Sequence, residues 1–225
     1  MKKQIISTIT LPAVLILSLI FCISAYAGEP DRSVIDELQS YKIIEPADDL
    51  RLNDNLTRAE AVKILCVAGG YGEIDHVQAF DFFPDVPTTH WAAKYISVGF
   101  EDHFIHGDEN GYFNPENYIS YQDFEKILVC ILGYGEYAKL TGGYPSGYLT
   151  WGSSLGLNQD LGSDYTADIT RGDAMIMIHN ALDVPLLVHT QTNIEADGSE
   201  TPIYEMRDGE TYPLDTLRIE LDNLE

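Results

Sequence analysis

The chain has 225 residues, 36 of them acidic and 13 basic, and its formal net charge at pH 7 is −23. So acidic a protein has no broad cationic surface, which argues against nucleic acid as a partner. Hydrophobic residues make up 45% of the chain, so there is enough apolar material for a packed core and the composition is not that of a disordered protein. We expect one domain or a few small repeats.

An export signal is expected at residues 1–27. Lys2 and Lys3 precede an apolar run from Leu11 to Ile23, which ends in Ala25-Tyr26-Ala27, the small-x-small pattern of a cleavage site. We expect cleavage after Ala27 and a secreted product. Because no later stretch has about 18 unbroken apolar residues, no membrane span is expected after cleavage.

Residues 28–76 are expected to form a helix-loop-helix unit. A first helix is predicted from Ser33 to Ile44, and a second begins after Thr57. Thr57 can cap this helix while Glu60, three residues later, reaches back to the backbone of the cap, which is the pattern of a capping box. Apolar residues then follow at helical spacing as far as Ala68.

Residues 77–140 repeat this organisation. A helix is predicted from His90 to Phe100, a turn-rich loop from Gly107 to Pro115, and a second capping box at Ser120 and Asp123. The eleven residues that start at Lys126 repeat the eleven that start at Lys63, with seven identities. Such self-similarity indicates repeated structural units.

Residues 141–187 form a third unit, with a helix predicted from Tyr144 to Gly152 and a third capping box at Thr170 and Asp173. The predicted fold is therefore mainly α, with three helix-loop-helix repeats. Residues 188–225 differ, because they are rich in Thr, Ile, Tyr and acids and carry turn signals at Asp197-Gly198 and Asp208-Gly209. We expect this acidic tail to form a short β-hairpin or meander.

Several of these residues together resemble the S-layer homology domain. They are Phe83-Pro84-Asp85-Val86, His90-Trp91-Ala92, Gly107, Phe113-Asn114-Pro115 and Thr57-Arg58-Ala59-Glu60. The resemblance covers about 30–185. It implies three repeats that fold into a pseudo-threefold prism, with binding grooves between the repeats. It also implies a non-catalytic module that attaches exported proteins to pyruvylated secondary polysaccharide in the cell wall of a Gram-positive-type bacterium.

Arg58 and Arg171 each occupy the first helical position after a cap. A cation there is disfavoured by up to about 1 kcal/mol, because the helix dipole already concentrates positive charge. An anionic ligand would offset this cost, since a helix N-terminus and a guanidinium together suit a carboxylate or phosphate. The alternative is an internal ion pair with an acid such as Asp54 or Asp168. The resemblance implies contact with the pyruvyl carboxylate.

The middle unit departs from this pattern, because Tyr121 stands where the other units have arginine. We expect its capping box to be mainly structural, and whether its groove binds is left open. The sequence and the resemblance together nominate as ligand-binding residues Arg58, Arg171, Trp91, Tyr144, Asp85, Thr57 and Thr170. The expected structural caps are Glu60, Ser120, Asp123 and Asp173. Trp91 and Tyr144 offer faces for stacking on sugar rings; core packing is the alternative for Trp91, and a turn cap is the alternative for Asp85.

Three other sequence patterns suggest hydrolase, calcium or zinc chemistry, and each is incomplete. Gly152-Ser153-Ser154-Leu155-Gly156 fits the G-x-S-x-G elbow of serine hydrolases, but no buried strand precedes it, so we expect no enzyme. The acidic turn at 108–111 lacks the full ligand series of a calcium loop. His103 and His106 have no second pair to complete a zinc site. We therefore expect no metal and no cofactor.

Two cysteines follow the signal, and each lies in an apolar helical stretch. Cys66 and Cys130 are expected to be buried thiols, with a disulfide between them as the alternative. The predicted function is wall anchoring, with cell-wall polysaccharide as the partner. The alternative is a cell-surface protein–protein adaptor or assembly subunit that uses the acidic tail to contact a surface protein.

Overall fold

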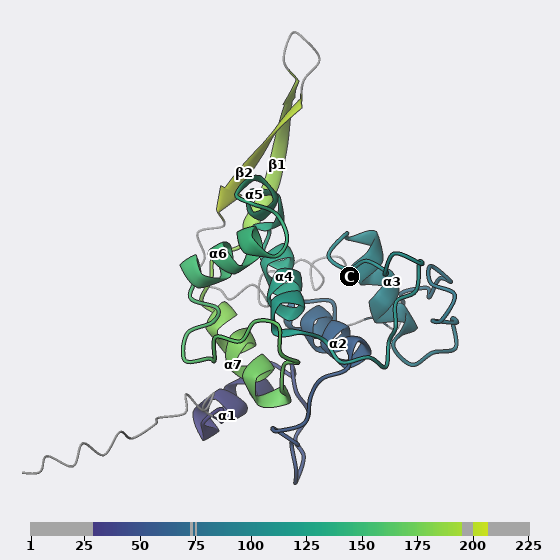
Figure 1. Cartoon of the computed structure of the whole chain (residues 1–225), viewed down its shortest axis with the longest axis vertical. Helices are drawn as coiled ribbons and strands as arrows, with labels where there is room; N and C mark the ends of the chain where they lie inside the picture. The colour runs from purple at the N-terminus through teal and green to yellow at the C-terminus, as the bar shows by residue number, and fades with distance from the viewer. Residues whose placement is uncertain (1–28, 73, 75, 195–199, 207–225) are drawn as a thin grey trace, which may run out of the picture.

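The computed structural model describes residues 29–72, 74, 76–194 and 200–206. The expected signal at 1–27 and the end of the tail lie outside this part of the chain. The described residues form seven helices and a two-stranded sheet (Figure 1). They are α1 (Arg32–Ser40), α2 (Arg58–Ala68), α3 (Ala93–Glu101), α4 (Tyr121–Ile131), α5 (Gly135–Leu140), α6 (Ser146–Ser154), α7 (Arg171–Ala181), β1 (Leu187–Ile194) and β2 (Glu200–Met206). The prediction of a mainly helical chain is confirmed.

Three eleven-residue helices, α2, α4 and α7, begin at the predicted boxes. The Thr57 hydroxyl accepts a hydrogen bond from the Glu60 N–H (3.2 Å), and the Glu60 carboxylate accepts one from the Thr57 N–H (3.0 Å). The other two helices have one such bond each, from Asp123 N–H to Ser120 Oγ (3.3 Å) and from Asp173 N–H to Thr170 Oγ1 (3.1 Å). Each cap satisfies a backbone donor that the first turn of a helix leaves unpaired.

The first residue of each capped helix is bonded to a loop that precedes a different capped helix. The three bonds run from Arg58 N–H to Asn117 O (2.8 Å), from Tyr121 N–H to Ala167 O (2.9 Å) and from Arg171 N–H to Asp54 O (2.9 Å). They join α2 to the loop before α4, α4 to the loop before α7, and α7 to the loop before α2. The contacts therefore close a ring.

The core is centred on α4, which packs against α2, α5, α6 and α7. Phe124 and Leu128 lie on its buried face, four residues apart, as the helical spacing of apolar residues predicts. α1 packs against α7, and α3 packs against α2.

Cys66 is buried and Cys130 half-buried, and both are free thiols, so the alternative of a disulfide between them is wrong.

Two helices differ from expectation. α3 begins at Ala93 rather than His90, because a turn closed by His90 N–H and Pro87 O (2.8 Å) precedes it. α5 was not expected; it follows Gly133, whose φ of 89° ends α4 with a left-handed residue.

Ser153 and Ser154 lie at the end of α6, so the G-x-S-x-G match is not the turn between a strand and a helix that a hydrolase elbow requires.

The β1–β2 hairpin forms the described part of the tail, as predicted. The strands pair antiparallel from Leu187 opposite Met206 to Ile194 opposite Glu200. The hairpin starts at the helical body, where the Leu187 N–H donates to Leu132 O (3.0 Å), and extends away from it (Figure 1).

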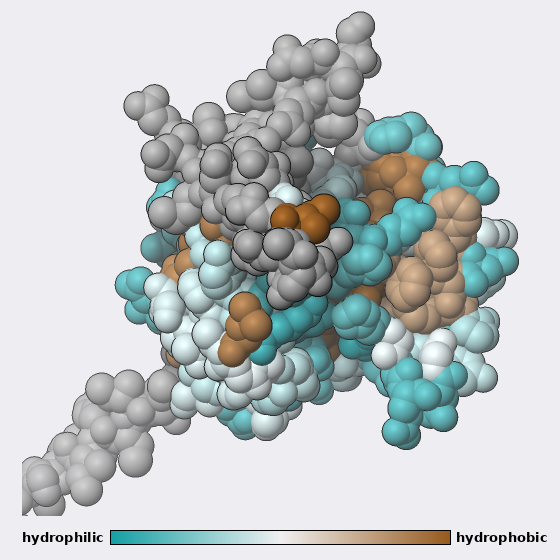
Figure 2. Space-filling model, turned by 90° about the horizontal axis from the view of Figure 1, so that it is seen from above, coloured by the Kyte–Doolittle hydropathy of each residue, from teal (hydrophilic) through white to brown (hydrophobic). Residues whose placement is uncertain are grey.

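Two exposed aromatic side chains lie beside α3. Phe80 and Phe82 are exposed, and the Phe82 ring packs on Phe100 of α3 with centroids 4.6 Å apart. Figure 2 shows apolar colour on the side where α3 lies, while much of the remaining face is hydrophilic. None of the helices in the described part of the chain has the length and apolar character needed to cross a membrane.

One acidic side chain, Glu125 of α4, is fully buried. It lies against α6 at Gly152, where a Cβ atom would come within 1.6 Å of its Oε1. Oε1 accepts a hydrogen bond from Asn158 Nδ2 (3.4 Å), whereas Oε2 has no partner among the described residues. Burial raises the pKa of Glu125 to about 8. The folded protein therefore keeps this proton at pH values where the unfolded chain has lost it.

Glu125→Gln should remove this proton linkage and stabilise the protein at alkaline pH. In the wild type, the unfolding free energy should fall as pH rises from 4.5, the ordinary pKa of a glutamate, to about 8. At pH 8 we expect the variant to be more stable by about 1–3 kcal/mol, because no charge is buried. Urea denaturation at pH 5 and pH 8 measures the unfolding free energies of the wild type and the variant. Glu101→Gln on the exposed end of α3 is the control. An unchanged pH dependence in Glu125→Gln would contradict the assignment.

Candidate functional site

A cavity of about 620 Å³ lies beside the start of α2. We call it the Arg58 groove. It is lined by Arg58, Phe104, Ile105, His106, Gly107, Asp108, Phe113, Asn114, Asn117, Tyr118, Asp123, Lys126, Ile127, Lys139, Tyr144 and Tyr148. These residues come from α2, α4, α5, α6 and the loops before α4 and α6. The volume is in the range of small-molecule sites.

The Arg58 side chain is held by uncharged groups. Its Nε donates to Phe113 O (2.9 Å) and its Nη2 to His106 O (3.2 Å). The guanidinium carbon lies 4.7 Å from the centre of the Phe113 ring, in a cation–π arrangement. Within the described chain these two bonds use two of the five guanidinium donors, so Nη1 still has donors to offer a ligand. Arg58 is therefore positioned without a neutralising ion pair.

One part of the anion-site hypothesis needs correction. The hypothesis requires free N–H groups at the helix N-terminus beside the guanidinium, but these groups are occupied. The N–H groups of Arg58 and Ala59 donate to Asn117 O (2.8 Å) and Pro115 O (3.0 Å), and that of Glu60 donates to its cap. An anion in this groove must therefore be bound by side chains, with Arg58 as the fixed donor.

The lining of the Arg58 groove contains three cationic side chains, Arg58, Lys126 and Lys139, and two acidic ones, Asp108 and Asp123. Lys139 is paired with Glu136 of the same helix (2.5 Å). Lys126 Nζ donates to Phe104 O (2.8 Å). Burial lowers the pKa of both Lys126 and Arg58, and the nearby charge of Asp123 opposes that shift. In a chain with a net charge of −23, the groove therefore brings Arg58 and Lys126 together as two cations that no ion pair neutralises within the described residues.

Tyr144 lies in the same groove as Arg58. Its hydroxyl donates to Asp123 Oδ1 (2.8 Å), while the residue remains 52% exposed. The ring can therefore meet a ligand while the hydroxyl fixes its orientation. Lys126 and Lys139 were not predicted from the sequence. The spacing of three residues between Asp123 and Lys126 places these two on one face of a helix and could have indicated Lys126.

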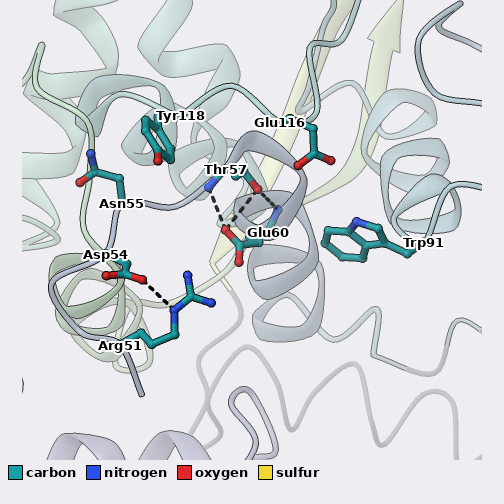
Figure 3. Close-up of a pocket in the computed structure, with 8 residues that line it drawn as sticks. All are labelled: Arg51, Asp54, Asn55, Thr57, Glu60, Trp91, Glu116 and Tyr118. Carbon is teal, nitrogen blue, oxygen red and sulfur yellow. Dashed lines mark hydrogen bonds and ion pairs between the residues drawn. The ribbon is translucent and has the colours of Figure 1, made fainter. Parts of the chain in front are cut away.

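A second cavity, of about 600 Å³, borders the Thr57–Glu60 cap of α2 (Figure 3). We call it the Trp91 pocket. It is lined by Arg51, Asp54, Asn55, Thr57, Glu60, Trp91, Glu116 and Tyr118. Trp91 is 54% exposed, so the alternative that it fills the core is wrong. Arg51 Nε is paired with Asp54 Oδ2 (2.7 Å), and Glu116 Oε1 lies 3.5 Å from His90 Nε2.

Arg171 is arranged differently from Arg58. Its Nε donates to Leu50 O (3.1 Å), at the position that Phe113 O occupies for Arg58, but its Nη1 lies 3.5 Å from Glu60 Oε1. This is the internal ion pair that the sequence left open, with Glu60 as the partner rather than Asp54 or Asp168. Arg171 lines neither the Arg58 groove nor the Trp91 pocket.

The remaining nominated residues lie close to the backbone. Asp85 accepts hydrogen bonds from the N–H groups of Phe113 (3.0 Å) and Asn114 (2.6 Å), which supports its alternative role as a turn cap. Thr57 lines the Trp91 pocket, whereas Asp85 and Thr170 line neither cavity. Asp85 thus holds the loop whose carbonyl in turn positions Arg58.

Aromatic side chains pack together at the start of α4. Tyr121 is buried, and its ring lies 5.3 Å from that of Tyr165. Its hydroxyl is buried without a hydrogen-bond partner among the described residues. No guanidinium is present at this helix start, so its chemistry differs from that at Arg58 and Arg171.

Glu60 combines two roles that substitutions can separate. Glu60→Ala removes both the capping bond to Thr57 and the partner of Arg171, and should lower the unfolding free energy by about 1–2 kcal/mol. Glu60→Gln can keep the capping bond while losing the charge, and should cost less than about 1 kcal/mol. Urea denaturation of both variants at neutral pH tests the separation, with Glu101→Ala as a surface control. If the two variants lose the same unfolding free energy, the whole effect of Glu60 comes from the ion pair and none from the capping bond.

Part of the chain matches a known protein family. The S-layer homology domain model matches residues 82–125, which include Asp85, Trp91, Phe113 and Asp123. A cell surface protein of Thermoanaerobacter kivui is 26% identical over 162 residues, which are 70% of this chain and 21% of that protein. A middle cell wall protein of Brevibacillus brevis is 28% identical over 137 residues, 60% of this chain and 13% of that protein.

A surface layer protein of Brevibacillus choshinensis is 26% identical over 144 residues, 62% of this chain and 12% of that protein. The chain thus spans about a fifth or less of the length of these curated relatives. The chain therefore contains an S-layer homology domain at residues 82–125, and it is a protein of the cell surface or cell wall.

Proposed function

We propose that this protein is a non-catalytic anchoring module that binds an anionic, pyruvylated cell-wall polysaccharide through the Arg58 groove. The observation that carries the proposal is the arrangement of Arg58. Its guanidinium is fixed by two carbonyl oxygens and an aromatic ring, and it has no acidic partner at hydrogen-bonding distance within the described chain. A cation held in this way is prepared for a negative charge from outside the molecule.

The other lining residues suit a sugar that carries the acid. Tyr144 and Tyr118 present aromatic faces that can pack on a sugar ring, and Asn117 and Asp123 offer groups that can bind hydroxyls. Lys126 adds a second positive charge on the α4 side of the groove. The groove therefore combines the two features that an acidic glycan requires, a cation for the acid and an apolar wall for the ring.

We also infer that the chain contains three S-layer homology repeats, at 28–76, 77–140 and 141–187, arranged as a pseudo-threefold prism. The three capped helices and the closed ring of bonds at their first residues support this arrangement. Residues 1–27 are proposed as the export signal, and 188–225 as a separate tail whose described part is the hairpin.

Arg171 is proposed as a second, weaker contact to the polymer, together with the helix start at Thr170. An anion there must compete with Glu60, which lies 3.5 Å from the guanidinium. Weak contacts at two positions still add to the retention of a long polymer, because the second contact forms at a high effective concentration.

The test is sedimentation of the protein with isolated wall sacculi before and after chemical removal of the polysaccharide. Arg58→Ala should weaken binding to intact walls by about tenfold to a hundredfold, which corresponds to the loss of a charge-assisted hydrogen bond. Arg171→Ala should weaken it by only about twofold to fivefold, because this arginine is already paired. The matched control is Arg32→Ala, which removes the same charge from an exposed ion pair with Asp36 on α1.

The outcome also separates wall anchoring from the adaptor alternative. If the protein is an adaptor that uses the acidic tail, its binding to the sacculi should change neither when the polysaccharide is removed nor in Arg58→Ala. Undiminished wall binding by a folded Arg58→Ala variant, with a circular dichroism spectrum like that of the wild type, would overturn the assignment of the Arg58 groove.

A further inference from the structure

The buried carboxyl group of Glu125 lies at the contact between α4 and α6, which pack side by side (Figure 1). Only the missing side chain of Gly152 on α6 leaves room for it, since a Cβ atom there would overlap its Oε1. Asn158, which follows α6, donates to Oε1, and Oε2 has no partner among the described residues. A buried carboxylate needs strong donors at both oxygens, so this contact fits a neutral carboxyl group.

A negative charge on Glu125 would find no cation nearby. Among the described residues, the titratable groups in its neighbourhood are Tyr121 on α4, Tyr165 in the loop before α7 and Asp173 on α7. α6 itself has neither acidic nor basic residues. The charged groups on the other helices that pack against α4 interact elsewhere, Lys139 of α5 with Glu136 and Arg58 of α2 with the loop at 106–113.

The packing of α6 on α4 also shapes the Arg58 groove. Tyr148 lies on α6 and Tyr144 precedes it, and both line the groove. Asp123 and Lys126 of α4 line it as well, and Lys126 is the residue next to Glu125. The Tyr144 hydroxyl donates to Asp123 Oδ1 (2.8 Å), so the two sides of the groove are joined. Any separation of α6 from α4 therefore changes the site around Arg58.

We propose that Glu125 positions α6 for ligand binding in a pH-dependent way: the neutral carboxyl group lets α6 pack on α4, and loss of its proton separates the helices and takes Tyr144 and Tyr148 away from Arg58. Because burial raises the pKa of Glu125 to about 8, the groove is assembled below that pH and is lost above it. This inference rests on the proposed function and adds a regulation to it, the release of the wall polymer at alkaline pH.

Sedimentation with isolated wall sacculi at pH 7 and pH 9 tests this dependence. At pH 9 only about a tenth of Glu125 keeps its proton, so binding by the wild type should be about tenfold weaker than at pH 7. Glu125→Gln stays neutral at both pH values, and its binding should change by less than about twofold. Glu101→Gln, on the exposed end of α3, is the matched control and should show the full loss.

Lys126 provides the rival explanation for a loss of binding at high pH. It lines the groove, and burial lowers its pKa, so its own deprotonation would also weaken the binding of an anion. That loss would occur in Glu125→Gln as well. An equal loss of binding in the wild type and in Glu125→Gln, or no loss in the wild type, overturns the proposal.

Trp151 reports the position of α6 without any wall polymer. Its Nε1 donates to Thr141 Oγ1 (3.0 Å), and its ring lies 5.4 Å from that of Tyr134. The chain has two tryptophans, so Trp91→Phe leaves Trp151 as the source of tryptophan fluorescence. Between pH 7 and pH 9 the emission should move to longer wavelength in Trp91→Phe, because separation of α6 exposes the ring, and should stay unchanged when Glu125→Gln is added.

The fluorescence separates failure of this inference from failure of the proposed function. Unchanged Trp151 emission across this pH range overturns the positioning by Glu125, even where wall binding falls. A Glu125-dependent shift of the emission in a protein that does not bind sacculi at either pH supports the movement of α6 and overturns the proposed function.

Discussion

The structure depends on one repeated interaction, the hydrogen bond from the first residue of each capped helix to the loop before another capped helix. The N–H groups at the start of a helix have no partners within the helix and must find them elsewhere. Here the side-chain caps satisfy one donor, and the loops at 115–117, 165–167 and 52–54 satisfy the two before it. The same bonds that complete each helix therefore hold distant parts of the chain together.

This interaction also explains why the three helix starts have different chemistry on a similar backbone. The residue at the first helical position is directed at the neighbouring loop in each case. At Arg58 the loop supplies a carbonyl oxygen and an aromatic ring, and the cation remains unpaired by acids. At Arg171 the corresponding carbonyl is present, but Glu60 is close enough to pair. At Tyr121 the position is filled by aromatic packing.

Local features of the fold could be predicted from the sequence. Capping by Thr57, Ser120 and Thr170 depends on residues three apart, so the pattern alone indicates it, and the hairpin follows from composition and turn signals. The exposure of Trp91 could not be predicted, because a tryptophan in an apolar stretch fits a core equally well. Arg171 and Glu60 are 111 residues apart in the chain, and only the folded structure brings them together.

Residues that lie far apart in the chain also form the site, so its shape and charge could not be predicted. Lys126 and Lys139 come from α4 and α5, and Tyr118 comes from the loop before α4, so no single motif in the sequence contains the groove. The hydrogen bonds of the Arg58 and Ala59 N–H groups could likewise not be predicted, because their acceptors are almost 60 residues away in the chain. Long-range backbone contacts thus decide which predicted donors remain available to a ligand.

The central claim is that the Arg58 guanidinium receives negative charge from a wall glycan. The most direct measurement is the nuclear magnetic resonance signal of the Arg58 Nε–Hε group during titration with polysaccharide released from walls. The account predicts that this signal shifts progressively with added polysaccharide, while that of the exposed Arg32 does not. Saturable binding of the polysaccharide with no change in the Arg58 signal would contradict it.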